Sequence, residues 1–284
     1  MIAQSAADFT IRDLCLALEV SRSGFYRWRS RLPSRRDQLN SHLLQHMEAA
    51  FKRSRQTYGS PRLTRHLRQQ NIHCNEKRVA RLMRLHTMRA RQKRPFRPRT
   101  TQCARGRSAA PNLLKQRPAP DRPNQAWVAD ITYLWTVSGW VYLAAVMDLY
   151  SRRIVGWSIG PSLETSLVKE ALKQALVARR PAPGLLHHSD RGLQYTSSAF
   201  QALLAISQIT PSMSAAGHCY DNAAMESFWS TLKTELIHHH SFQDLAQARL
   251  TIFDYIEVFY NRQRLHSALD YMSPVDFEQP LNQN

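Results

Sequence analysis

The spacing of hydrophobic residues changes character along the chain. Between residues 9 and 90, apolar positions recur every three to four residues, which predicts amphipathic helices. From residue 125, they gather instead in three runs rich in β-branched and aromatic residues, at 126–136, 140–150 and 153–160. Only short polar or glycine-containing breaks separate these runs, so they predict an antiparallel meander.

Helix-like and strand-like segments alternate after the meander. Three strands followed by this alternation predict an α/β domain with a mixed sheet. The expected helices are 164–179, 197–207, 221–239 and 244–261, and the expected short strands are 185–190 and 209–213. We expect the core to contain the aromatic residues Trp127, Trp135, Trp140, Trp157, Phe253 and Phe259, together with Ile256.

In the first part of the chain, the spacing of apolar residues predicts small all-helical segments. Residues 1–35 form a helical arm with a possible helix-turn-helix, in which Ser21 can cap the second helix. Residues 36–90 are a better helix-turn-helix candidate, with Ser60 followed by a proline as one helix start and Asn75 as another. Its basic residues are expected to contact DNA, with a solvated basic face as the alternative: Arg62, Arg65, Arg68, Lys77, Arg78, Arg81 and Arg84.

Charge divides the chain in the same place. The net charge is +18, but residues 1–120 carry 27 Lys and Arg against 6 Asp and Glu, whereas residues 121–284 carry 12 against 15. A concentrated positive field is typical of nucleic-acid binding. Residues 91–120 are expected to form a basic, proline-containing linker, and residues 121–284 a catalytic core with a helical extension at its end.

Cysteine spacing and hydropathy indicate in which cellular compartment the protein is expected. The four cysteines, Cys15, Cys74, Cys103 and Cys219, are far apart, which argues against a disulfide framework and a zinc ribbon. No secretory signal and no apolar run of membrane-spanning length is present. We therefore expect a cytoplasmic, nucleoid-associated protein without a membrane partner.

Three acidic residues are candidates for chemistry. Asp130 lies among apolar neighbours inside a predicted strand, where a carboxylate is costly unless it is paired or binds a cation. Asp190 follows a short strand, a usual ligand position in α/β sheets. Glu226 lies on a predicted helix. Carboxylates from separate elements can hold two divalent ions about 3.5–4 Å apart for phosphoryl transfer.

The predicted helix over 221–239 adds polar residues on the face of Glu226. Asn222, Ser230 and Lys233 stand at helical spacing from it. A carboxylate and a lysine two turns apart can grip a metal ion and a nearby phosphate together.

These residues also carry a family resemblance. Asp190 and Glu226 are separated by 35 residues, which resembles the D,D(35)E signature of retroviral integrases and similar transposases. Four segments closely resemble the downstream-frame subunit of insertion-sequence transposases of the family numbered three. They are WVADITYLWTVSGWVYLAAVMDLYSRRIVGW, HHSDRGLQYTS, CYDNAAMESFWSTLKTEL and YNRQRLHSALDYMSPVDFE. YGSPRLTRHLRQQNIHCNEKRVARLMR resembles that family's helix-turn-helix segment, so the resemblance covers nearly the whole chain from about residue 10.

The resemblance implies a ribonuclease H-like catalytic fold and a DDE transposase that cuts and joins DNA strands through a circular intermediate. It implies that Asp130, Asp190 and Glu226 are metal ligands, and that Lys233 and Asn222 support the site at the DNA ends. It also implies dependence on Mg²⁺, for which we expect two ions and substitution by Mn²⁺. The expected partners are double-stranded DNA, as transposon ends and target, other copies of the chain, and an upstream-frame subunit or fusion.

One segment departs from the family pattern. Ala215, Ala216, Gly217 and His218 precede CYDNA where the family often has a basic residue, so a phosphate contact is expected to be lost there.

Two other functions remain open from the sequence. A ribonuclease H-type nuclease would share the fold, but such enzymes usually show four clustered carboxylates and lack a basic DNA-binding arm. A regulatory DNA-binding protein with an inactive catalytic domain is the second alternative, although all three acids are present. Strand-transfer assays with Mg²⁺ separate the three functions.

Overall fold

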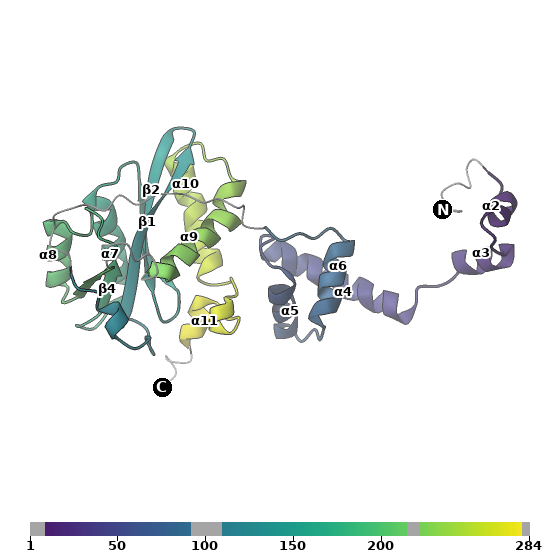
Figure 1. Ribbon diagram of the computed structural model, residues 1–284, viewed down its shortest axis with the longest axis horizontal. Coiled ribbons are helices and arrows are strands. Elements are labelled where there is room, and N and C mark those ends of the chain that lie inside the picture. Colours follow the sequence, from purple (N-terminus) through teal and green to yellow (C-terminus); the bar gives the residue numbers. More distant parts are fainter. Residues whose placement is uncertain (1–8, 92–109, 215–221, 280–284) are drawn as a thin grey trace. The chain divides into compact units, whose positions relative to one another are not determined.

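The computed structural model describes residues 9–91, 110–214 and 222–279 (Figure 1). The chain forms two compact units, residues 1–50 and 51–284. None of the helices in these described ranges combines the length and the hydrophobicity that crossing a bilayer requires.

The described part of the first unit begins with two short helices, α2 (Ile11–Ala17) and α3 (Arg22–Arg29). Each starts at a hydroxyl cap, because the side chains of Thr10 and Ser21 accept hydrogen bonds from backbone N–H groups of the first turn. The Ser21 cap confirms the expected helix start. The next helix, α4 (Arg35–Arg53), contains the residues at which the first unit ends and the second begins.

The helix pair α5 (Ser60–Gln69) and α6 (Glu76–Leu85) opens the second unit. Asn75 caps α6 as expected, since its Oδ1 accepts the N–H of Lys77 at 2.8 Å. The expected cap at Ser60 is wrong: Gly59 occupies that position, and Ser60 is already the first helical residue. Its hydroxyl lies 3.5 Å from Glu76, so it joins the starts of the two helices instead.

A five-stranded mixed sheet forms the centre of the second unit. Its strands are β1 (Ala126–Thr136), β2 (Gly139–Asp148), β3 (Ile154–Gly160), β4 (Leu186–Ser189) and β5 (Thr210–Met213). They lie in the order β3-β2-β1-β4-β5. The first three pair antiparallel, as the predicted meander requires, whereas β4 and β5 run parallel to β1. The mixed sheet is therefore confirmed.

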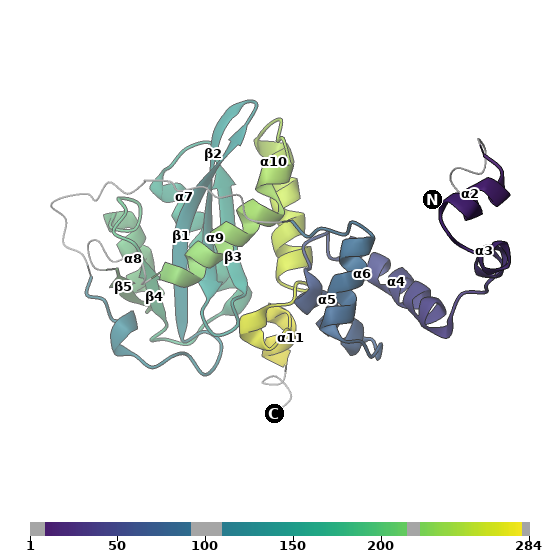
Figure 2. The same cartoon turned by 45° about the vertical axis from the view of Figure 1, so that its right-hand side comes forward.

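Helices cover both faces of this sheet (Figures 1 and 2). On one face, α7 (Thr165–Arg179) and α8 (Ser198–Ile206) pack on Trp127, Ala129 and Val146. On the other face, α9 (Ala223–Glu235) and α10 (Leu245–Phe253) pack on Leu134 and Leu143. A short helix, α11 (Pro274–Glu278), ends the described chain.

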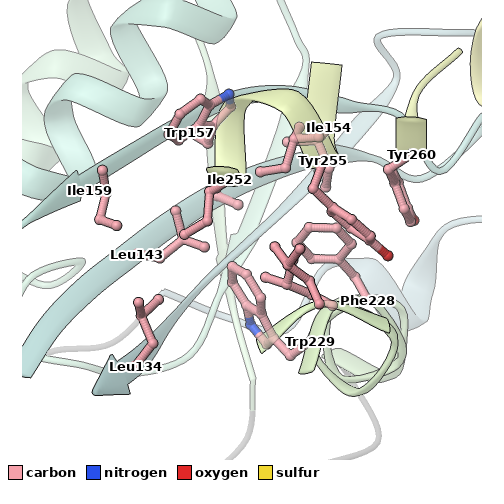
Figure 3. Packing of buried hydrophobic residues seen from close by; sticks show 14 of the residues in the cluster. Leu134, Leu143, Ile154, Trp157, Ile159, Phe228, Trp229, Ile252, Tyr255 and Tyr260 are labelled. Atoms are coloured by element: carbon pink, nitrogen blue, oxygen red, sulfur yellow. The ribbon is translucent and has the colours of Figure 1, made fainter. Parts of the chain in front are cut away.

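The α9 face of the sheet has an aromatic core. Figure 3 shows Phe228 and Trp229 of α9 beside Tyr255 and Tyr260 of the following segment, over the aliphatic side chains of the strands. Phe228 and Tyr260 meet edge to face with ring centroids 4.8 Å apart. This packing fixes α9 against β1, and β1 and α9 carry two of the three candidate acids.

On the opposite face, a glycine allows close contact between β3 and α7. A Cβ atom on Gly156 would lie 2.2 Å from the carbonyl oxygen of Ala171 and 2.6 Å from the backbone N of Ala175. Both neighbours are backbone atoms and cannot turn away. Only glycine therefore fits at this point of the strand.

The segment expected as one helix over 244–261 changes form along its length. After α10, residues Asp254–Tyr260 form a π-helix, and α9 likewise ends at Glu235 before a 3₁₀ turn over Ile237–His239. The wider turns of a π-helix shift which side chains face the core. Ile256 and Phe259 are buried as expected, but the expectation for Phe253 is wrong, because this side chain is 52% exposed.

Two of the four tryptophans expected in the core are also outside it. Trp127 and Trp157 are buried, whereas Trp135 is 57% exposed and Trp140 is 51% exposed. These two residues form a cross-strand pair near the turn of the β1–β2 hairpin. The helices that cover the sheet leave this end of the hairpin open to solvent.

Candidate active site

Asp130 lies in the middle of β1, with its carboxylate held by two donors. The N–H of Ile131 donates to Oδ1 at 2.8 Å, and the indole N–H of Trp229 donates to Oδ2 at 3.0 Å. Burial, with the neighbouring Asp190 carboxylate as the second cause, raises the pKa of Asp130 to about 7. The two hydrogen bonds favour the ionised form but do not outweigh burial.

The parallel pairing of β1 with β4 places Asp190 at the level of Asp130. Val128 pairs with His188, so the two acids each stand two residues beyond the same rung of the sheet. The N–H of Gly192 donates to Asp190 Oδ1 at 2.9 Å, and burial raises the pKa of this carboxyl as well. The structure thus brings together two acids that are far apart in the sequence.

Glu226 lies in the first turn of α9 and is exposed. Its negative charge is the smallest of the causes that raise the pKa of Asp130. Across the described ranges, no three acidic, histidine or cysteine side chains converge closely enough to enclose an ion. The structure therefore shows a half-buried carboxylate pair, with the third acid close enough to affect the pKa of Asp130.

The oxygen-rich surroundings of the pair fit a divalent cation. Within the described chain, the Oδ1 atom of Asn222 and the hydroxyl of Tyr195 are buried without a hydrogen-bond partner. The Tyr195 pKa is raised well above its ordinary value by burial, and by Asp130 and Asp190. Carboxylates whose ionisation is opposed by burial, beside unpartnered oxygens, suit a hard cation with its water ligands.

Lys233 and Asn222 both reach the strand that carries Asp130. Burial lowers the pKa of Lys233, while its attraction to Asp130 acts in the opposite direction. The Lys233 Nζ lies 5.4 Å from the centroid of the Tyr133 ring. Asn222 is buried at the start of α9, and its Nδ2 donates to the carbonyl of Ala129 at 3.3 Å. Both expected supporting residues thus border the acids.

A buried ion pair anchors the other end of α9. Glu235 accepts hydrogen bonds from Arg264 at 2.7 Å from Nη2 and 2.9 Å from Nε, and from the Tyr255 hydroxyl at 2.8 Å. Burial works against the charge of Arg264, but Glu235 outweighs it, so the arginine pKa is raised. Both charged side chains are almost completely buried.

Sequence reasoning missed this anchor and also missed Trp229 and Tyr195. Trp229 stands three residues after Glu226, which is one helical turn, and that spacing could have identified it as a partner of the site. No comparable signal links Glu235 with Arg264, because they belong to different elements.

The expected DNA contacts fall into two groups in the structure. Arg62 is half-buried, and burial together with the nearby Arg264 lowers its pKa. Arg68 donates to the carbonyl of Cys74, and Arg65 lies over the Tyr271 ring at 5.1 Å. These three therefore make contacts within the second unit, although Arg65 and Arg68 remain exposed. The other four lie on α6, with Arg78 half-exposed and the remainder exposed: Lys77, Arg78, Arg81 and Arg84.

The segment with the departure from the family pattern, Ala215 to His218, lies outside the described residues.

Comparison with known proteins gives three family matches. Two integrase core domain families match residues 120–219 and 207–274, and an HTH-like domain family matches residues 38–96. The chain is 44% identical over 280 residues to transposase InsF for insertion sequence IS3A of Escherichia coli K12, covering 98% of this chain and 96% of the relative. It is also 44% identical over 270 residues to the insertion element IS600 uncharacterized 31 kDa protein of Shigella sonnei, covering 95% and 99%.

Among solved structures, the chain aligns with the HTLV-2 integrase catalytic core domain in complex with magnesium. The TM-score is 0.43 at 14% identity, over 56% of this chain and 98% of that one. The sequence relatives and the family matches are the stronger likeness.

Proposed function

This chain belongs to the family of insertion-sequence transposases that contains InsF of IS3, and from that membership we propose that Asp130, Asp190 and Glu226 are its catalytic metal ligands. The protein is a DNA strand-transferase with an integrase core, which cleaves and joins DNA strands during transposition of an insertion sequence. The site assignment is carried by the β1–β4 pairing, which sets Asp130 and Asp190 at one level of the sheet.

The proposed cofactor is Mg²⁺, as two ions that Mn²⁺ can replace. When bound, the metal would activate the attacking hydroxyl and stabilise charge on the phosphate. The hydrogen bond from Trp229 to one oxygen of Asp130 restricts rotation of the Asp130 carboxylate. Lys233 stands beside the same acid and is placed to bind a DNA phosphate next to the reacting one. Asn222 fixes the start of α9 against Ala129, and with it the position of Glu226.

Iron-directed cleavage of the protein tests the metal site. Fe²⁺ in place of Mg²⁺, with ascorbate and peroxide, produces hydroxyl radicals that cut the backbone close to the bound ion. We expect cuts near residues 130 and 190 and near the start of α9, detected by mass spectrometry. Excess Mg²⁺ should suppress them, and Asp190→Asn should reduce them, whereas Lys173→Gln on α7 should not. Cuts confined to other parts of the chain would contradict the assignment.

For DNA binding, we propose that the exposed face of α6 supplies the main phosphate contacts, with Lys77, Arg81 and Arg84 foremost and Arg78 beside them. On α5, the exposed Arg65 and Arg68 and the half-buried Arg62 are proposed as further DNA contacts. The proposed division of the chain is a helical arm over 1–35, a DNA-binding domain over 36–90, a basic linker over 91–120 and the catalytic core over 121–284.

Salt dependence measures the contribution of α6. In the Arg81→Gln/Arg84→Gln variant, we expect weaker binding to every duplex and a slope of log K against log salt that is flatter by about 1.8, since each phosphate contact contributes about 0.9. The measurement is fluorescence anisotropy at several salt concentrations. The matched control is Lys169→Gln/Lys173→Gln on α7, which should leave the slope unchanged. Equal slopes for wild type and the α6 variant would exclude this surface.

The proposed partners are the two transposon ends and the target, all double-stranded DNA. Two ends must be handled together, so we propose that several copies of the chain assemble on DNA. An upstream-frame subunit or fusion is the proposed second protein partner, and the bacterial nucleoid in the cytoplasm is the proposed place of action.

A further inference from the structure

Three exposed aromatic side chains form a continuous patch on the β1–β2 hairpin. Tyr133 is 43% exposed, Trp135 57% and Trp140 51%, whereas Trp127 on the same strand is fully buried. The Trp140 ring meets Trp135 edge to face at a centroid distance of 5.0 Å and Tyr133 at 5.2 Å. We call Tyr133, Trp135 and Trp140 the aromatic patch.

The hairpin that carries the aromatic patch is held in place at its turn. The N–H groups of Val137 and Ser138 donate to the carbonyls of Phe242 and Gln243, at 2.9 Å and 3.1 Å. The Ser138 hydroxyl also donates to the Gln243 carbonyl at 3.0 Å. The rings are therefore presented by a fixed backbone, so little order has to be gained when a ligand binds.

The aromatic patch begins close to the proposed catalytic acids. Asp130 lies three residues from Tyr133 and five from Trp135 on one strand, so alternation starts its side chain on the opposite face of β1 from theirs. A rise of about 3.3 Å per residue puts the Cα atoms of Tyr133 and Trp135 about 10 Å and about 17 Å along the strand. At about 3.4 Å per nucleotide of one strand, these distances set a minimum of about three and five nucleotides between a phosphate bound at Asp130 and the two rings. Lys233 joins the two places, because it interacts with Asp130 and lies over the Tyr133 ring.

We propose that the aromatic patch binds unpaired nucleobases of the DNA strand that is being cut or joined, by stacking them on its rings. This binding site rests on the proposed position of the catalytic acids. Bases within a duplex are already stacked on one another, so the ligand is a strand with frayed or extruded bases near the reacting phosphate. Aromatic rings accept any base in this way, and Lys233 supplies a cation for the adjoining backbone.

The small size of the aromatic patch disfavours a second copy of the chain as its occupant. A buried aromatic residue covers about 150–250 Å², so three half-exposed rings offer about 300 Å². A stable protein interface needs about 800 Å² from each partner. A few nucleobases match the available area, and the proposed position of the catalytic acids brings a DNA strand to this strand of the sheet.

The test measures the affinity of the full chain for three fluorescent DNA probes of equal length without added metal. One is fully paired, one has five unpaired nucleotides at an end, and one has the same tail without bases. We expect wild type to bind the unpaired tail more tightly than the abasic tail. Trp135→Leu should weaken binding to the unpaired tail by about 5- to 100-fold and leave the other two probes unchanged. Trp135→Phe keeps a ring and should retain most of the affinity.

Phe253→Leu is the matched control, since it removes an equally exposed aromatic ring elsewhere in the second unit and should change none of the three affinities. Equal wild-type affinity for the unpaired and abasic tails would overturn the proposal. So would a Trp135→Leu variant that changes the oligomeric state, measured by light scattering, while keeping its affinity for the tail. The probes require no catalysis, so tail binding can fail while iron-directed cleavage still marks the acids, and the reverse outcome is equally visible.

Discussion

An asparagine in place of Asp130 is expected to slow strand transfer by about a thousandfold or more and also to stabilise the metal-free protein. The loss of rate follows from removing one charged metal ligand, since metal stabilisation of the phosphate in the transition state contributes several kcal/mol and each 1.36 kcal/mol is a factor of ten. The two effects have opposite signs, which separates a functional carboxylate from a structural one.

The gain in stability follows from the raised pKa of Asp130. Its pKa is about 7 in the folded chain against 3.8 as the ordinary value, chiefly because of burial and then because of Asp190. The unfolded chain therefore releases this proton first, and stability falls as pH rises from about 4 to 7. Asparagine has no such proton, so Asp130→Asn should be more stable than wild type by about 2–4 kcal/mol at pH 8 and little different at pH 4.

Urea unfolding in EDTA at both pH values, together with a strand-transfer assay in Mg²⁺, checks both parts of this prediction. Asp121→Asn is the control, because Asp121 is exposed and lies ahead of β1, and it should change neither rate nor stability. A variant at position 130 that keeps full joining activity would remove this residue from the site. A variant destabilised at pH 8 would show that the carboxylate has a structural role.

Loss of the Arg264 side chain is the second large expected effect. Arg264→Ala leaves the Glu235 carboxyl almost completely buried, and within the described chain its remaining side-chain hydrogen-bond donor is the Tyr255 hydroxyl. Removing one member of a buried ion pair typically costs about 3–5 kcal/mol of unfolding free energy. Strand transfer should fall as well, because Glu235 ends the helix on which Glu226 and Lys233 lie.

Urea unfolding of the wild type and three variants resolves this effect. Arg262→Ala is the control, since Arg262 is exposed two residues earlier and its loss should change stability by less than about 0.5 kcal/mol. Replacing both charges, as Glu235→Leu/Arg264→Met, should recover most of the stability that Arg264→Ala loses. If Arg264→Ala unfolds at the same urea concentration as wild type, Glu235 is not dependent on this partner.

Much of the fold follows from local patterns in the sequence. The β-rich runs at 126–136, 140–150 and 153–160 became three antiparallel strands because their turns are too short for any other connection. Ser21 and Asn75 cap helices because their side chains can accept a backbone N–H. The candidate acids were identified from their positions on predicted strands and a helix, and from the sequence motifs around them. Their roles stay a prediction.

The remaining features depend on contacts between distant segments. Alternation along β1 assigns Trp127 and Trp135 to the same face, but it cannot show that α7 and α8 cover the first and not the second. Phe253 was expected in the core because it stands at α-helical spacing from Ile256. That spacing does not reveal the π-helix that begins at the next residue. The pairing of Glu235 with Arg264 arises only when the segment after α10 folds back onto α9.

The anchor at Glu235 makes α9 a lever with its fixed point at the far end from Glu226. Nine residues at about 1.5 Å per residue separate the two glutamates along the axis, which is about 13.5 Å. A tilt of only about 10° around Glu235 would displace Glu226 by about 2 Å, roughly the length of a metal–oxygen bond. The angle at which the buried ion pair holds α9 would thus set the position of Glu226 at the proposed metal site. Substitutions around Arg264 are therefore expected to alter ion affinity without contacting that site.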